Sequence, residues 1–131
     1  MNVDAKVIYP ELSYVLIGVA FNIFNEIGYG MGEKYYQTAF KIELEKNKIP
    51  FSKERKVEMR YKEEKIGNYF LDFVIDNKIV VELKVRPRLG YVHIKQVTDY
   101  LKSINLKLAI IIYFTQNGVK YRRVINNSYI K

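Results

Sequence analysis

Apolar residues along the chain change their spacing from a helical period to an alternating one. Between Pro10 and Gly28 they recur every three or four residues, which predicts a helix that starts at Tyr9-Pro10 and ends at Gly28. After a glycine-rich loop, a second helix is predicted from about Glu33 to Lys48. Its inner face is expected to hold Tyr36, Ala39, Phe40 and Leu44.

The middle of the chain has the two-residue alternation of half-exposed strands. Strands are predicted over residues 53–61, 68–75 and 78–85, with a turn at 62–65 and a tight connection at Asp76-Asn77. On the first of these strands Val57, Met59 and Tyr61 are expected to share a face.

The last third of the chain predicts one more helix and two more strands. The helix covers about residues 91–104, a nearly all-apolar strand covers 106–114, and a final strand covers 119–125 after a turn at Asn117-Gly118. The order ααβββαββ is that of an α/β (α+β) fold. Because no linker or repeat divides the chain, one domain over residues 1–131 is expected.

Charge and composition narrow the class of protein. The 131 residues include no cysteine, which excludes disulfide frameworks, thiolate metal sites and cysteine nucleophiles. No secretory signal or membrane span is visible, so a soluble cytoplasmic protein is expected. The net charge is +8, and residues 66–131 contain 11 Lys and Arg against 4 Asp and Glu. Such a basic surface attracts polyanions, most commonly nucleic acid.

Three charged residues interrupt two otherwise apolar strands. Glu82 and Lys84 lie two apart and therefore point to the same face of their strand. If Asp76-Asn77 forms the turn, Asp72 lies opposite Val81 or Glu82 on the neighbouring strand. The three groups then form either a structural ion pair or a functional site. Charges in apolar strands are costly unless they are paired or metal-bound, which favours the site.

Several motifs around these residues resemble a known nuclease family. Asp72 followed by Glu82-Leu83-Lys84 resembles the D…E-x-K motif of the PD-(D/E)XK, or restriction-endonuclease-like, superfamily, with Leu71 in place of the proline. The segment 30–36 fits the G-x-x-E-x-x-Y motif of the GxxExxY proteins in that superfamily, and the segment 93–101 fits their H-x-x-Q and Q-x-x-x-Y-L helix. The resemblance implies a restriction-endonuclease-like core, with a central mixed β-sheet flanked by helices.

The resemblance also implies a metal site. Asp72, Glu82 and the backbone carbonyl of Leu83 would bind Mg²⁺, or Mn²⁺ as a substitute, since hard oxygen ligands suit hard cations. Lys84 would orient the attacking water or stabilise the phosphate in the transition state. Glu33 would hold the metal, usually through water, although an acid at a helix start also has a purely structural explanation.

Further residues are expected to contact the substrate. Candidates on the third helix and the preceding loop are His93, Gln96, Tyr100, Arg86, Arg88 and Lys95. Each has a simpler alternative. Tyr100 fits a core aromatic, His93 a structural histidine, and the basic residues solvated surface charges.

These features predict a Mg²⁺-dependent nuclease that acts on nucleic acid, with DNA favoured over RNA. A homodimer that acts on branched or duplex DNA refines this hypothesis, because a small twofold protein suits twofold DNA. The alternatives are a catalytically inactive nucleic-acid-binding module of the same fold and a partner-binding protein with a tyrosine-rich surface. The retention of Asp72, Glu82 and Lys84 together argues against an inactive module.

Overall fold

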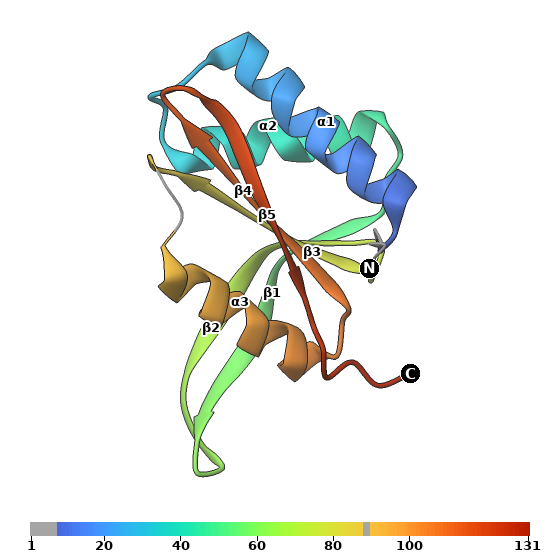
Figure 1. Cartoon of the computed structure of the whole chain (residues 1–131), viewed down its shortest axis with the longest axis vertical. Coiled ribbons are helices and arrows are strands. Elements are labelled where there is room, and N and C mark those ends of the chain that lie inside the picture. The colour runs from blue at the N-terminus through green and yellow to red at the C-terminus, as the bar shows by residue number, and fades with distance from the viewer. Residues whose placement is uncertain (1–7, 88–89) are drawn as a thin grey trace, which may run out of the picture.

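The computed structural model of the chain describes residues 8–87 and 90–131, which form three helices and five strands. Their order is ααβββαββ, as predicted (Figure 1). In chain order they are α1 (Pro10–Ile27), α2 (Glu33–Lys46), β1 (Phe51–Tyr61), β2 (Glu64–Ile75), β3 (Ile79–Val85), α3 (Tyr91–Ile104), β4 (Leu108–Thr115) and β5 (Gly118–Ile125). The largest difference from the prediction is β2, which begins four residues earlier because the turn before it is shorter.

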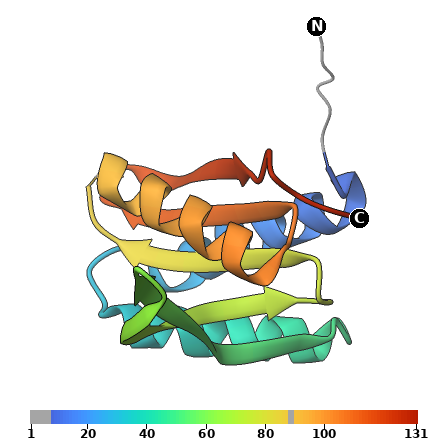
Figure 2. The same ribbon diagram turned by 90° about the horizontal axis from the view of Figure 1, so that it is seen from below.

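The five strands form one mixed sheet in the order β1-β2-β3-β4-β5. All neighbours are antiparallel except β3 and β4, which are parallel and joined by the crossover helix α3. Helices α1 and α2 cover one face of the sheet, and α3 covers the other (Figures 1 and 2). No helix among the described residues is long and apolar enough to cross a membrane.

Two apolar clusters hold the helices on the sheet. On the α1 and α2 side, Tyr36, Phe40 and Leu44 are buried at the predicted four-residue spacing, and the Tyr36 ring stacks on Phe114 with centroids 4.3 Å apart. Ala39, also predicted inward, is partly buried against the same cluster. On the other side, Val97, Tyr100 and Leu101 of α3 are buried in the second cluster. Because helices cover both faces of the sheet, β4 is buried almost throughout, as its apolar sequence predicted.

The connection between β2 and β3 sets the register of the site. Asp76 and Asn77 have φ values of 52° and 54°, in the left-handed region where Asp and Asn are tolerated best. Lys78 belongs to the connection too, because Ile75 pairs with Ile79. The observed register therefore differs by one residue from that of a two-residue turn, and its continuation places Asp72 level with Glu82.

The β1–β2 hairpin rotates about its own axis at Asp72. The ladder passes from Lys53↔Phe73 directly to Arg55↔Leu71, and the residue between them on β1, Glu54, has a φ of 56°. Phe73 packs with the α1 and α2 cluster, whereas Leu71, two residues earlier, packs with the α3 cluster. Regular alternation would put both on the same face, so the strand turns over between them.

Beyond this rotation the hairpin projects from the body of the molecule (Figure 1). Val57 is buried and Met59 is partly buried, but Tyr61, predicted to share their face, is 61% exposed. Alternation along β1 still puts Tyr61 on the face of Val57 and Met59, and its exposure follows from its place at the hairpin tip. The register shift between Met59 and Arg60 is a bulge on β2, where the ladder passes over Ile66, and the tip extends beyond the helix that covers Val57 and Met59.

Candidate active site

Asp72 and Glu82 lie where β2 and β3 separate. The ladder between these strands ends at Phe73↔Val81. Beyond it the Asp72 backbone N–H donates to Glu82 Oε2, and the Leu83 N–H donates to Asp72 Oδ2, both at 2.8 Å. The two carboxylates thus take the place of ladder hydrogen bonds, which fixes them side by side at the opening between the strands.

Glu33, the first residue of α2, reaches the same edge of β3. Its Oε2 accepts a hydrogen bond of 3.4 Å from the Val85 N–H. In an extended strand the N–H and C=O of one residue point to the same edge, so the carbonyl of Leu83 faces the side on which Asp72 lies. The structure therefore brings four oxygen donors to the same edge of β3: the carboxylates of Glu33, Asp72 and Glu82 and the carbonyl of Leu83. The Glu33 carboxylate lies further along this edge, at the Val85 N–H, and makes no hydrogen bond to the other two carboxylates.

Burial makes this carboxylate pair hard to ionise fully. Glu82 has no exposed surface, and burial, followed by the charge of Asp72, raises its pKa to about 7. Burial also raises the pKa of Asp72, against the opposing effects of the Leu83 N–H and Lys84. Within the described ranges, no Lys or Arg nitrogen lies within 4.0 Å of either carboxylate. The structural ion pair considered from the sequence is therefore not formed.

Lys84 follows Glu82 on the same face of β3 and is half-buried. Its positive charge lowers the pKa values of both Asp72 and Glu82. Lys84 thus acts on the pair through its field and leaves the carboxylate oxygens free of a direct ammonium contact. A lysine in this position can orient a water or a phosphate oxygen beside the carboxylates.

Tyr69 is a component of the site that the sequence did not indicate. Its hydroxyl donates to Glu82 Oε1 at 2.8 Å, and its ring stacks on Tyr100 with centroids 4.2 Å apart. Burial, followed by the negative charge of Glu82, raises the pKa of Tyr69, so its hydroxyl stays protonated and remains a donor. Tyr69 is three residues from Asp72, and regular alternation would place it on the opposite face. Only the rotation of the hairpin brings it to Glu82.

Three residues of α3 that were predicted to contact the substrate differ in exposure: one is buried and two are exposed. Tyr100 is only 2% exposed and lies behind Tyr69, which agrees with the alternative of a core aromatic; burial and then Glu82 raise its pKa to about 12. Gln96 is exposed. Lys95 forms an exposed ion pair with Asp99 at 3.3 Å. Neither is held against the carboxylates.

Arg86 and His93 form a contact beside the end of β3. Arg86 Nη1 lies 3.0 Å from His93 Nε2, and because a guanidinium only donates, Nε2 is the acceptor and the proton lies on Nδ1. Burial, and then the charge of Arg86, lowers the pKa of His93 and keeps it neutral. In the described part of the chain, Arg86 Nε and His93 Nδ1 are buried without a hydrogen-bond partner. Arg88, the other predicted loop contact, lies outside the described residues.

The donor set fits a hard divalent cation. Among residues 8–87 and 90–131, no cluster of three or more His, Cys, Asp or Glu side chains is arranged to hold a metal. Mg²⁺ needs fewer, because it usually keeps several waters and binds one or two carboxylates. Asp72, Glu82 and the Leu83 carbonyl supply such a set, and a cation would offset the charge that the buried pair resists carrying.

The mixed sheet, with two helices on one face and a crossover helix on the other, has the restriction-endonuclease-like architecture. The model of the PD-(D/E)XK nuclease superfamily matches residues 10–124, and the chain belongs to that superfamily. Among solved structures, the crystal structure of SSO0001 is similar in fold, with a TM-score of 0.55 and 18% identity. The alignment covers 94% of this chain but only 60% of SSO0001. No curated protein matches the sequence significantly.

Proposed function

We propose that the chain is a metal-dependent nuclease that hydrolyses phosphodiester bonds of nucleic acid. The observation that carries the proposal is the pair of Asp72 and Glu82, held by backbone hydrogen bonds at the opening between β2 and β3, with Lys84 on the same face. A buried acidic pair without a direct basic partner has no evident value for folding. Membership in a nuclease superfamily supports the same conclusion.

Each residue has a distinct role in this proposal. Asp72, Glu82 and the Leu83 carbonyl hold Mg²⁺ or Mn²⁺, and Glu33 contributes through a bound water. When bound, the metal supplies a water of lowered pKa and neutralises charge on the scissile phosphate. Lys84 orients the attacking water and stabilises the negative charge that develops on the phosphate.

Arg86 and His93 are the proposed phosphate contacts beside these residues, since both retain unpaired N–H donors next to the end of β3. Gln96, Lys95 and Arg88 are proposed as outer contacts that meet a longer substrate. Tyr100 acts indirectly, as the support of Tyr69.

DNA is the favoured polymer. The proposed subfamily is that of the GxxExxY proteins, on the basis of the motif at Glu33. A homodimer is proposed as the working unit. The outer faces of α1 and α2 support this, because they expose Phe21, Tyr35 and Ile42, apolar residues that a second copy could cover. The alternative is an inactive nucleic-acid-binding module. The ordered contacts of Asp72 and Glu82 favour the nuclease.

Calorimetric titration with Mn²⁺ tests the metal site directly. Wild type is expected to bind Mn²⁺, and Asp72→Ala to bind at least about tenfold more weakly, because one of two carboxylate ligands is lost. Asp72→Asn keeps an acceptor for the Leu83 N–H and separates loss of charge from loss of structure. Asp99→Ala, which removes an exposed carboxylate on α3, serves as the control. Equal affinity in Asp72→Ala and wild type would refute the assignment.

Tyr69→Phe is expected to weaken Mn²⁺ binding and slow cutting by about tenfold, the usual effect of losing a hydrogen bond to a metal ligand. The substitution removes the donor to Glu82 and keeps the ring stacked on Tyr100. Since that hydrogen bond lowers the pKa of Glu82, the pH profile of Mn²⁺ binding should also move to higher pH. Tyr100→Phe keeps the stack and the Glu82 hydrogen bond, so it should behave like wild type. An unchanged pH profile in Tyr69→Phe would exclude the positioning role.

A further inference from the structure

A cavity of about 360 Å³ adjoins the candidate site on the side of the hairpin that faces α2. Its lining consists of Gln37 from α2, Lys53 and Glu54 from β1, and Phe70 and Asp72 from β2. Asp72 therefore belongs both to the cavity and to the carboxylate pair. A group bound in the cavity would lie directly beside a phosphate that a metal at Asp72 would hold.

Phe70 is the aromatic member of this lining. It is 53% exposed and lies on β2 next to the buried Leu71. The rotation of the hairpin explains this placement. Leu71 turns toward α3, so Phe70 turns to the opposite side, where it lines the cavity beside Gln37. Phe70 does not belong to either apolar cluster of the described residues, so its ring is available to a ligand in the cavity.

The polar residues around Phe70 suit a nucleotide. Gln37 follows Glu33 by four residues, so both lie on the same face of α2, and its amide can donate to and accept from the edge of a base. The Lys53 ammonium lies 4.6 Å above the Phe73 ring and lowers the pKa of Asp72, which places its charge near both. Glu54 offsets that charge, so the cavity is not a general polyanion site and selectivity must come from the ring and the amide.

We propose that this cavity binds the base of a nucleotide next to the scissile phosphate, unstacked from its neighbours and placed against Phe70. This inference rests on the proposed nuclease function and specifies its substrate class. A base can reach Phe70 only if it is not held in a continuous duplex, so the substrate is single-stranded or carries an unpaired nucleotide at the cutting point. Stacking of one base on an aromatic side chain strengthens binding by about 5- to 150-fold.

Fluorescence anisotropy can test this with labelled single-stranded DNA and RNA of roughly 12 nucleotides and with the matching DNA duplex. Divalent metal is omitted so that no cutting competes. Phe70→Ala is expected to weaken single-strand binding about tenfold and duplex binding less than twofold. Phe70→Trp should restore single-strand binding, because it supplies a ring again.

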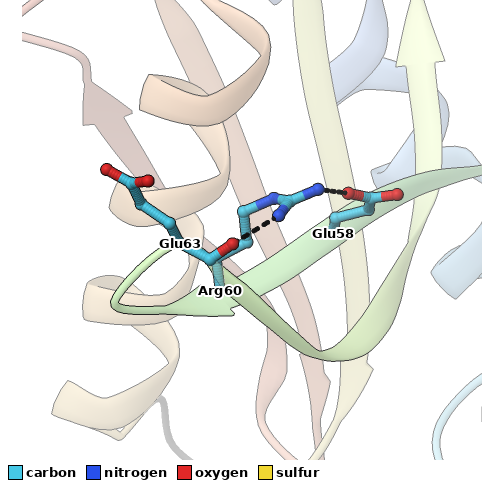
Figure 3. A network of polar contacts seen from close by, with 3 residues as sticks. All are labelled: Glu58, Arg60 and Glu63. Carbon is cyan, nitrogen blue, oxygen red and sulfur yellow. Dashed lines mark hydrogen bonds and ion pairs between the residues drawn. The ribbon is translucent and has the colours of Figure 1, made fainter.

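Tyr61→Ala is the matched control, since Tyr61 is an exposed aromatic on the same hairpin. It lies at the tip, next to Arg60, which donates to Glu58 and to the Glu63 carbonyl (Figure 3). Single-strand affinity in Tyr61→Ala should match that of wild type. If Phe70→Ala and Tyr61→Ala reduce affinity equally, the hairpin binds non-specifically and the inference fails.

Cutting assays in Mg²⁺ distinguish failure of this inference from failure of the proposed function. If wild type cuts, and Phe70→Ala has the single-strand affinity of wild type, the inference is overturned but the proposed nuclease function stands. If wild type never cuts, and Phe70→Ala binds single strands more weakly than wild type does, the binding site is supported and the nuclease function is overturned. Wild type that binds no single strand would overturn the inference.

Discussion

Glu82→Ala is expected to lower the rate of Mg²⁺-dependent cutting by at least about a thousandfold. The substitution removes a proposed metal ligand and leaves both the Asp72 N–H and the Tyr69 hydroxyl without their acceptor. Initial rates would be measured on single-stranded, flapped, four-way and duplex DNA and on RNA, at millimolar Mg²⁺.

The matched control for this variant is Glu58→Ala. Glu58 is a carboxylate on the neighbouring hairpin, paired with Arg60 at 2.6 Å and exposed (Figure 3). Its substitution should leave cutting unchanged. Cutting that survives in Glu82→Ala would place the reaction elsewhere. Cutting that is lost equally in Glu58→Ala would point to a general loss of folding.

Lys84 allows the roles of binding and chemistry to be separated. Because its ammonium makes no ion pair within 4.0 Å of Asp72 or Glu82 in the described structure, Lys84→Ala leaves the proposed ligands in place. Mn²⁺ should therefore still bind. Cutting should fall by about a hundredfold or more, because the group that orients the water and stabilises charge on the phosphate is lost. Loss of Mn²⁺ binding in Lys84→Ala would instead show that Lys84 maintains the ligands.

The elements of the fold could be predicted because each has a strong local pattern. Gly28 marks the end of α1, and Asp76-Asn77 marks the connection between β2 and β3. That connection was enough to bring Asp72 near Glu82, although its length was wrong by one residue.

The residues of the site that the sequence did not indicate depend on how the β1–β2 hairpin is oriented in the folded protein. Tyr69 and Phe70 reach their positions only because the hairpin rotates at Asp72, and no local alternation indicates that rotation. The exposure of Gln96 and the burial of Tyr100 likewise depend on how α3 lies on the sheet. Helical spacing places the two residues on one face but does not show where that face ends.

In the metal-free protein, Glu82→Gln is expected to increase the free energy of unfolding at pH 8. The pKa of Glu82 is raised from its ordinary 4.5 to about 7 in the folded chain, so the folded state binds the additional proton. This contribution to stability is fully present below pH 4.5 and is lost as pH rises through about 7. At pH 8 the charged Glu82 then costs on the order of 3 kcal/mol. Asp72, whose pKa is also raised, acts in the same direction.

The expected gain in Glu82→Gln is about 3 kcal/mol at pH 8, where Glu82 is charged and glutamine is not, and close to zero at pH 4.5, where the folded-state Glu82 is neutral too. Urea unfolding in the presence of EDTA, at both pH values and for both proteins, measures the difference. Since most substitutions of buried residues destabilise, a stabilised variant would be strong evidence that Glu82 is retained for function. Mn²⁺ should raise the unfolding temperature of wild type at pH 8 and have much less effect on Glu82→Gln, because the cation compensates the charge that only wild type carries. A variant less stable than wild type at pH 8 would mean that the hydrogen bonds from Asp72 and Tyr69 outweigh the cost of the buried charge, and that the pair serves the fold.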